Sequence, residues 1–436
     1  MTSLQDGALN FNSSMRFDFN GGRISSDAGL LAIKSFGEAL GIPKLLDAAL
    51  PHAKVKTHSD ASLAEQLIYS SIAGYHHDDD ADSLRNDPVF TSILGKNALA
   101  SQPTISRFLN GFTQEGLGRL NELLLEVLEK AYRLEGLEHI VLDIDTTYVQ
   151  THGKQEKSSY NVHYSTTGFN PLVVYNGLTG DLLKLELREG STYCSKDVRA
   201  FLEPLIIWLR ETFPDTKILI RGDSGFATPE IYELAEEYDA EYLIRLKQNA
   251  ILMKLADDVS AEFSSLYANQ HDKTCVLYDS FTYQAGSWDI ARRVVVKVER
   301  KAGELFPRLG FIVTSLEADP QTVLKAYNLR GNMENFIKET KLDFGLDSLS
   351  HSSFAANCAK CLLKAFAYNL INLMKRLVLP KKYLKSRMTS IRSDLMKIGA
   401  KIVSSGRRVY FRLSSHCPHK NRFLETMRRI STLCFA

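Results

Sequence analysis

Cysteine is scarce in this chain of 436 residues, and its six copies are scattered. Scattered cysteines fit reduced thiols in the cytosol better than a disulfide framework. Only Cys358 and Cys361 lie close together, and because no second pair follows at zinc-binding spacing, we expect both to pack in a helical core. The sequence also lacks an apolar run long enough to span a bilayer, and its first residues lack a signal-peptide pattern. We therefore expect a cytoplasmic protein without a membrane partner.

Net charge is also low, at +2, but it is unevenly distributed. From Lys375 to the C-terminus there are 16 Lys plus Arg and 2 Asp plus Glu, a balance of +14, which leaves −12 for the preceding residues. Such a basic segment indicates a phosphate backbone as partner, although a solubilising surface is the alternative. Lys381 and Lys382 begin this segment and are candidate DNA-binding residues.

Acidic residues occur within or at the end of two otherwise apolar segments. Residues 138–148 have the pattern of a buried strand in which Asp143 and Asp145 share one face. Carboxylates in such a strand are costly unless they are paired or bound to metal. Residues 217–223 predict a second strand, which ends at Asp223 between glycines. These carboxylates are candidate metal ligands.

A helix is predicted from Tyr327 to Lys341, with polar side chains aligned along it. At 3.6 residues per turn, Tyr327, Arg330, Glu334 and Lys341 fall within a stripe about 60° wide. A carboxylate can hold Mg²⁺, and flanking cations suit a polyanion. The alternative is a solvated helix face with ion pairs between neighbouring turns.

The spacing Tyr327-x2-Arg330-x3-Glu334-x6-Lys341 resembles the Tyr-Arg-Glu-Lys signature of one group of bacterial insertion-sequence DDE transposases. The closest branch is the "thirteen-eighty" family of insertion sequences. Asp145, followed by two threonines, and Asp223, preceded by glycine, stand where this family places its other catalytic carboxylates. The resemblance also implies a β-rich insertion before the helix.

The fold class expected is α/β. The predicted order of three strands, helix, strand, helix, strand and a later helix is that of an RNase H-like core. We expect the following regions: a helical DNA-binding region at 1–135, the first part of the core at 136–247, the β-rich insertion at 248–318, the second part of the core with the Glu helix at 319–379, and a basic DNA-binding or dimerisation region at 380–436.

Within this core Asp145, Asp223 and Glu334 are expected to be catalytic and to hold two Mg²⁺ ions, for which Mn²⁺ would substitute. Asp143 is the fallback ligand. Arg330 and Lys341 would grip the DNA phosphates, and Tyr327 would hydrogen-bond or stack near the strand end.

The resemblance implies a transposase that binds terminal inverted repeats, cleaves the element ends and joins them to target DNA. A homodimer would hold two ends in a synaptic complex, in the bacterial cytoplasm at the nucleoid, and no small-molecule substrate is expected. Two rivals are a metal-dependent nuclease of the same fold without strand transfer and a DNA-binding repressor without catalysis. The presence of all three carboxylates counts against the repressor.

Two further regions are candidates for DNA contact. Thr104 and Arg107 would face outward from a helix that begins near residue 101, which fits helix-turn-helix binding, although an ordinary capped helix is equally consistent. Trp288 stands at a predicted hairpin turn. It either stacks on a flipped base while Arg292 and Arg293 hold phosphate, or anchors the hairpin as a core residue.

Two clusters of histidine with other potential ligands suggest metal binding at first sight. They are His76 to Asp82 and His416 to His419. Neither has the spacing of an EF-hand or a zinc motif. We interpret the first as a solvated turn at a helix end and the second as a loop.

Overall fold

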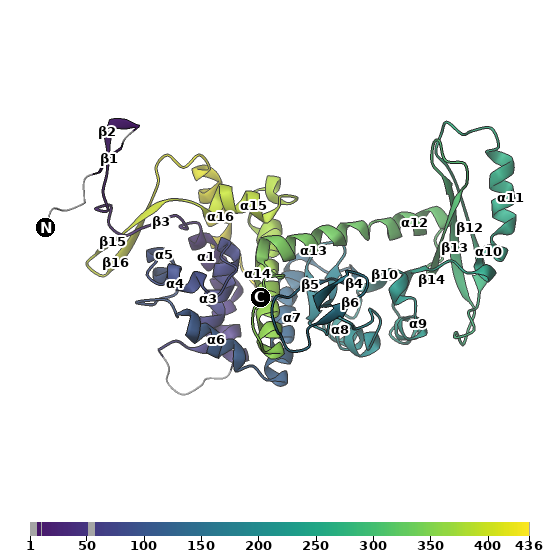
Figure 1. The fold of residues 1–436 in the computed structure, drawn as a ribbon, viewed down its shortest axis with the longest axis horizontal. Coiled ribbons are helices and arrows are strands. Elements are labelled where there is room, and N and C mark those ends of the chain that lie inside the picture. The colour runs from purple at the N-terminus through teal and green to yellow at the C-terminus, as the bar shows by residue number, and fades with distance from the viewer. Residues whose placement is uncertain (1–6, 10, 51–56, 436) are drawn as a thin grey trace.

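An eight-stranded mixed sheet, with strand order β12-β13-β14-β11-β10-β4-β8-β9, runs from the middle of the protein into the arm at the right of Figure 1. This computed structural model describes residues 7–9, 11–50 and 57–435. The strands are β4 (His139–Thr146), β8 (Leu172–Asn176), β9 (Leu182–Glu186), β10 (Lys217–Gly222), β11 (Glu241–Leu246), β12 (Cys275–Tyr283), β13 (Arg292–Arg300) and β14 (Arg308–Thr314).

The half of the sheet nearest the acidic residues matches the prediction. Strands β4, β10 and β11 run parallel, while β8 and β9 are antiparallel to their neighbours. Ile140, Leu142 and Ile144 of β4 are fully buried, as expected for a central strand that is covered on both faces. Helices α8 (Val198–Thr212) and α9 (Pro229–Glu237) connect β9, β10 and β11. The α/β class is therefore confirmed.

The insertion continues the same sheet, because β14 pairs with β11 from Leu243↔Thr314 to Leu246↔Phe311. Its three strands, β12, β13 and β14, agree with the β-rich insertion that was expected in this part of the chain. The sequence did not predict the two helices that precede them, α10 (Ala250–Leu255) and α11 (Asp257–Leu266). Helix α11 buries only Val259 and Phe263, so its apolar face is too narrow to give a clear helical pattern.

Helix α14 (Phe354–Leu377) is the hub of the helical end of the molecule, and nearly all its residues are buried. Helices α3 (Asp60–Ala73), α6 (Gln102–Asn110) and α7 (Gln114–Glu135) pack against it. Cys358 and Cys361 are free and buried within it, so core packing is confirmed for both. Among the described residues no helix combines the length and hydropathy needed to cross a membrane.

The two ends of the chain meet beside this hub. Helix α1 (Leu30–Leu40) packs on α16 (Lys420–Ser431), and β3 (Ile24–Ser25) pairs with the predicted hairpin of β15 (Ala400–Ser405) and β16 (Arg408–Leu413). The remaining helices and the N-terminal strands are α2 (Ile42–Ala49), α4 (Asp80–Leu84), α5 (Pro88–Ile93), α15 (Met388–Ile391), β1 (Gly7–Leu9) and β2 (Asn12–Phe17).

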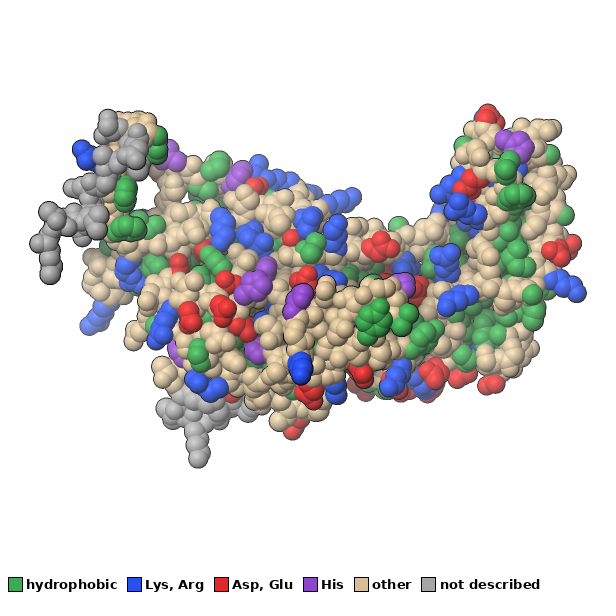
Figure 2. Space-filling view, viewed as in Figure 1, with side chains coloured by type: hydrophobic (Ala, Val, Ile, Leu, Met, Phe, Trp, Pro, Cys, Tyr) green, Lys and Arg blue, Asp and Glu red, His purple; other side chains and the backbone are tan. Residues whose placement is uncertain are grey.

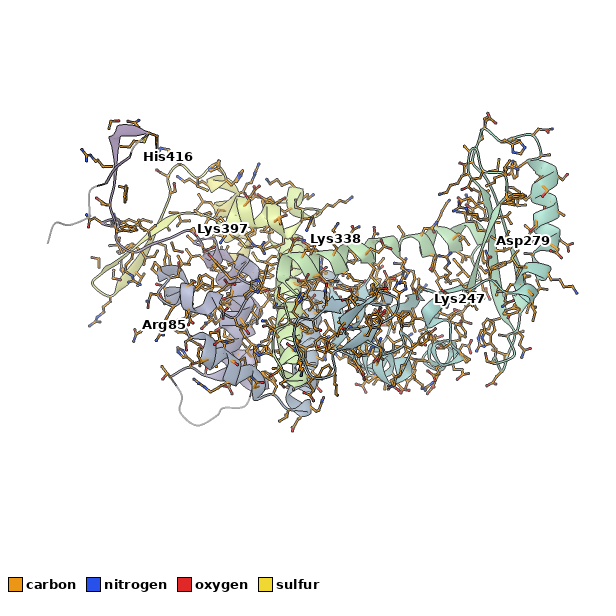
Figure 3. All side chains as sticks on the ribbon, viewed as in Figure 1. Arg85, Lys247, Asp279, Lys338, Lys397 and His416 are labelled. Atoms are coloured by element: carbon orange, nitrogen blue, oxygen red, sulfur yellow. The ribbon has the colours of Figure 1, made fainter. Side chains whose placement is uncertain are left out.

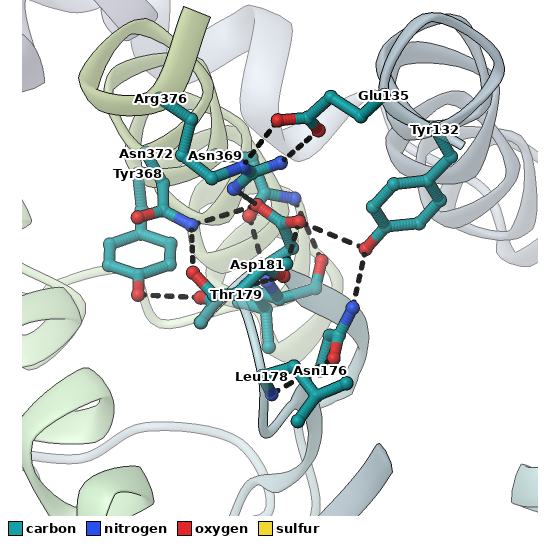
Figure 4. Close-up of polar contacts among 12 residues, drawn as sticks. Tyr132, Glu135, Asn176, Leu178, Thr179, Asp181, Tyr368, Asn369, Asn372 and Arg376 are labelled. Atoms are coloured by element: carbon teal, nitrogen blue, oxygen red, sulfur yellow. Dashed lines mark hydrogen bonds and ion pairs between the residues drawn. The ribbon is translucent and has the colours of Figure 1, made fainter. Parts of the chain in front are cut away.

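A buried polar network ties α7 and α14 to the turn between β8 and β9 (Figure 4). The Asp181 carboxylate, fully buried, accepts hydrogen bonds from Arg376 (2.8 Å), Asn372 (2.8 Å), Tyr132 (2.9 Å) and Thr179 (2.7 Å). Burial acts to raise the pKa of Asp181, but Arg376 and these hydrogen bonds outweigh it and hold the pKa below its ordinary value.

The cluster from His76 to Asp82 is not simply a solvated turn. Asp78 is only 9% exposed and its carboxylate contacts Lys360 and His351, each at 2.8 Å. The prediction was wrong for this residue because both partners come from segments almost three hundred residues later in the chain.

We expect Arg376→Ala to lower the free energy of unfolding by about 3 kcal/mol or more, because it leaves the buried Asp181 charge with neutral partners only. Urea denaturation followed by circular dichroism measures this loss. Arg308→Ala is the matched control, since Arg308 is 70% exposed and Glu304 is its one ion-pair partner in the part of the chain that the structure describes. Its effect should stay within about 0.5 kcal/mol. Equal losses in the two variants would contradict this role for Arg376.

Candidate active site

Asp145 and Asp223 lie at the carboxyl ends of two adjacent parallel strands. Strands β4 and β10 are in register at Asp143↔Arg221, so the residues two positions further along are neighbours. Asp223 caps the short turn η1 (Ser224–Phe226), its Oδ1 accepting the Gly225 N–H at 2.8 Å. The sheet topology thus brings together two carboxylates that are far apart in the sequence.

The Asp145 carboxylate is held between a backbone amide and an arginine. Its Oδ1 accepts the Thr146 N–H at 2.8 Å, and its Oδ2 lies 2.8 Å from Arg330 Nη2. Burial and the negative charge of Asp223 together raise the pKa of Asp145 from 3.8 to about 6, although Arg330 opposes the shift. Burial is therefore the main cause of the shift, and it outweighs the opposing charge of Arg330.

The helix predicted from Tyr327 to Lys341 consists of two helices. Helix α12 (Pro320–Asn328) and helix α13 (Gly331–Phe344) are separated by a turn at Leu329 and Arg330. Glycine and asparagine directly after Arg330 are weak helix formers, which favours an interruption there. Arg330 reaches Asp145 from this junction.

The other members of the predicted stripe differ in their surroundings. Tyr327 is partly buried. Burial raises the pKa of its phenol, while the charge of Arg330 acts to lower this pKa and the charge of Asp223 acts to raise it. Lys341 donates a hydrogen bond to the Tyr148 carbonyl. Glu334, in the first turn of α13, is exposed and forms no hydrogen bond or ion pair among the described residues. Its catalytic role remains a prediction.

Asp143, the fallback ligand, already forms an ion pair with an arginine. It is fully buried and accepts two hydrogen bonds from Arg221, at 2.5 Å and 2.7 Å. Arg221 also donates to the Ala326 carbonyl in α12. A Cβ at Gly177 would collide with both charged groups, so only glycine fits beside them. Asp143 therefore positions the strands and α12 beneath Asp145.

Arg221 is the residue that sequence reasoning missed. The available signal was an arginine within the apolar strand 217–222, at the level where a parallel neighbour would place Asp143. Buried arginines in strands need a carboxylate partner. Pairing the two acidic strands in register would have identified it.

Trp288 is a packed residue in this structure, the second of its two predicted alternatives. It is 6% exposed, and its ring meets Tyr232 and Tyr283 edge-on at centroid distances of 5.2 Å and 5.3 Å. The Arg292 guanidinium lies over the same ring and forms two 2.9 Å hydrogen bonds to Glu236. Neither side chain presents a free surface to DNA here.

Arg293 is also bound within the protein, donating to the Leu316 and Ala318 carbonyls at 2.6 Å and 2.8 Å. The position of these two arginines in the sheet explains their contacts. Residues 292 and 293 lie inside strand β13, paired with Tyr283 and Thr282, rather than in an exposed turn.

The other candidate DNA contacts lie on the surface. Arg107 is exposed and donates to the Thr104 hydroxyl at 3.2 Å. Lys381 and Lys382 are both exposed, and Lys382 lies 2.9 Å from Asp394. Lysine and arginine gather on the concave upper surface between the C-terminal elements and the insertion (Figure 2). Figure 3 shows Lys338 of α13 between these two parts.

The described residues contain no group of three or more His, Cys, Asp or Glu side chains already arranged to hold a metal ion. What they contain is a carboxylate pair, Asp145 and Asp223, with Arg330 as the cation beside it. Two neighbouring carboxylates suit a hard divalent cation, because such a cation prefers oxygen ligands and relieves their mutual repulsion.

Comparison with known proteins identifies a family. Residues 8–434 match the family model described as "Transposase DDE domain group 1". No curated protein matches the chain.

Solved structures with similarity include the piggyBac transposase synaptic complex with hairpin DNA, with 14% identity, 92% coverage of each chain and a TM-score of 0.42. Two others are the Mos1 transposase paired-end complex with the left transposon end and the Mos1 mariner paired-end complex with Mn, with 17% and 18% identity. For each of these, 50% of this chain and 68% of the other are covered, with a TM-score of 0.18.

The raised pKa of Asp145 predicts a pH-dependent gain in stability for Asp145→Asn in metal-free protein. A folded pKa of about 6, above the ordinary 3.8, means that wild-type stability falls as the pH rises through this interval. The advantage of the variant should therefore be absent in acid and reach about 3 kcal/mol above neutral pH.

Urea titrations across this pH range measure the difference. Asp279→Asn, on the exposed side of β12, is the control and should show no such trend. A difference that does not change with pH would contradict the predicted ionisation of Asp145.

Proposed function

The chain belongs to the family of group 1 transposase DDE domains, enzymes that cleave and transfer DNA, and from this membership we propose that it is the transposase of a bacterial insertion sequence. It binds terminal inverted repeats, cleaves the element ends and joins them to target DNA. The observation that carries the proposal is the Asp145–Asp223 pair at the carboxyl edge of the sheet, beneath the helix junction that holds Arg330 and Glu334.

The strand arrangement supports an RNase H-like core. Strands β9, β8 and β4 are antiparallel and consecutive, and β10 and β11 then extend the sheet parallel to β4. In this order the central strand and its parallel neighbour each supply one carboxylate. The chain returns to the same edge at the junction of α12 and α13, where Arg330 contacts Asp145, and Glu334 follows in the first turn of α13.

We assign Asp145, Asp223 and Glu334 as the residues that would hold two Mg²⁺ ions, or Mn²⁺ in their place. Bound metal supplies an activated water and stabilises charge on the leaving oxygen. Arg330, which neutralises Asp145 in this structure, is then free to contact the DNA phosphate. Lys341 and Tyr327, on either side of Arg330 along the chain, hold the same strand.

Duplex DNA is the partner, and a homodimer would bring two element ends together. The proposed contacts outside the active site are the basic C-terminal region, with the exposed Lys381 and Lys382, and the face of α6 with Thr104 and the exposed Arg107. Their exposure supports electrostatic contact with the phosphate backbone.

The test uses purified protein, Mg²⁺ and DNA that carries the sequences flanking the gene. We expect wild-type protein to cut at the element ends. Asp145→Ala, Asp223→Ala and Glu334→Ala should each lose at least about 100-fold in cleavage rate, because metal-ligand loss removes several kcal/mol of charge stabilisation. Asp279→Ala should cleave normally. Normal cleavage by Glu334→Ala would remove that residue from the proposed site.

A second arm supplies pre-cleaved ends and a target plasmid. Joining of the 3′ ends to the plasmid supports a transposase. Cleavage without joining would instead identify a nuclease, and binding without either reaction would identify a repressor.

The basic region makes a separate prediction about binding. Replacing Lys381 and Lys382 by alanine should weaken DNA binding equally for all sequences and lower the slope of log affinity against log salt by about 1 to 2. Titrations at several salt concentrations measure this slope. An unchanged slope would show that neither lysine contacts phosphate.

A further inference from the structure

A small second sheet stands directly after the strand that carries Asp145. It has the order β5-β7-β6, from β5 (Val149–Gln150), β7 (Thr166–Phe169) and β6 (Ser159–Asn161), and the chain returns from it to β8. It contributes two stacked tyrosine rings. The centroids of Tyr148 and Tyr164 are 4.6 Å apart, and the ring planes differ by 22°.

Tyr148 is the buried ring of this pair. It is 8% exposed, and a Cβ at Gly168 would collide with its hydroxyl, so the ring lies flush against the β7 backbone. The hydroxyl is buried and has no hydrogen-bond partner among the described residues, so packing holds the ring. Lys341 donates to the Tyr148 carbonyl and links this ring to α13.

Tyr164, the exposed ring of the pair, lies in a turn that is stabilised by hydrogen bonds to Asn161. The Asn161 Oδ1 accepts the backbone N–H groups of His163 (3.0 Å) and Tyr164 (3.3 Å), while its Nδ2 donates to the Gly190 carbonyl at 2.7 Å. The His163 ring packs edge-on against Tyr164 at 4.7 Å. The ring of Tyr164 is therefore held in place before any ligand binds.

The pair lies beside the catalytic carboxylates. Tyr148 follows Asp145 by three residues. Tyr164 stacks on Tyr148 at 4.6 Å and is therefore held near this end of β4. Burial, followed by the charges of Asp145 and Asp223, raises the pKa of its phenol, which agrees with this position. Tyr164 is nevertheless 43% exposed, although it stacks on Tyr148 and the His163 ring packs edge-on against it. Trp288, the aromatic residue that the sequence suggested for such a role, is buried elsewhere.

We propose that Tyr164, backed by Tyr148, is a stacking platform for an unpaired DNA base next to the bond that is cut. This inference rests on the proposed function. A base in a duplex has both faces covered by its neighbours, so a protein ring stacks readily only on an unpaired one. An aromatic face accepts any base, and the contact would orient the strand with its phosphate toward Asp145 and Asp223.

The test measures binding without metal, with full-length protein. The DNA is a duplex of the element's terminal sequence whose short 3′ overhang contains 2-aminopurine, a base that loses fluorescence when it stacks. We expect wild type and Tyr164→Phe to quench this fluorescence. Tyr164→Ala should not quench it and should bind the overhang about 10-fold more weakly, while its affinity for the blunt duplex stays within about 2-fold.

Two variants keep the result interpretable. Tyr160→Ala, at a 57% exposed position on β6, should quench like wild type. Tyr164→Leu retains apolar packing on Tyr148 without an aromatic face, so it replaces Tyr164→Ala if circular dichroism shows that the alanine variant is misfolded. Normal quenching by the correctly folded variant would overturn the proposal. Failure of Tyr164→Phe to quench would also overturn it, because the hydroxyl rather than the ring would then make the contact.

The stacking platform and the transposase function can be disproved separately. Wild-type protein that cleaves its own element ends without quenching the overhang would overturn only the stacking platform. Quenching that depends on Tyr164, in a protein that neither cleaves nor joins DNA, would leave the platform intact and overturn the transposase.

Discussion

The buried ion pair between Arg221 and Asp143 is the interaction on which the active site depends. It joins β4 to β10 and, through the Ala326 carbonyl, joins both strands to α12. Two charges removed from water require good mutual geometry, so the three segments have little freedom to shift relative to one another. Asp145 and Asp223, each two residues beyond this pair, inherit their relative position from it. Neither Asp143 nor Arg221 needs to touch DNA to decide where the carboxylates stand.

The carboxylates just beyond this ion pair are affected by burial and by the charge of Arg330. Asp145 is held with a raised pKa between Asp223 and Arg330, so the protein carries a carboxylate that gains from an added cation. The turn at residues 329 and 330 makes this balance possible, because it sets Arg330 at a junction instead of inside a regular helix. Glu334 remains outside the cluster on α13. In the proposed reaction Asp145 would help to hold the metal ions in place of Arg330, and the guanidinium would then contact the DNA phosphate.

Buried ion pairs also hold together the helical end of the molecule, where the central element is α14. Asp181 binds Arg376 and Asn372 of this helix, and Asp78 binds Lys360 of the same helix. Because burial makes an unpaired charge costly, these contacts fix the N-terminal helices and the β8–β9 turn on one support. The regions proposed to bind DNA and the region proposed to cut it therefore share one packed framework, which gives a bound duplex a defined relation to the carboxylates.

Local pattern alone determined much of this protein. The alternation of apolar residues predicted the strands that end near Asp145 and Asp223, and the basic C-terminal segment was visible from composition. Helical spacing predicted helix on both sides of residues 329 and 330, but not the turn between α12 and α13. These features depend on neighbours within a few residues. The tertiary structure decided that Asp143 pairs with Arg221, that Trp288 packs inside the insertion, that Asp78 is buried, and that Tyr164 stacks on Tyr148 beside the carboxylates. Whether a polar or aromatic side chain is free or occupied depends on partners that the fold brings from distant segments, and periodicity along the chain carries no information about them.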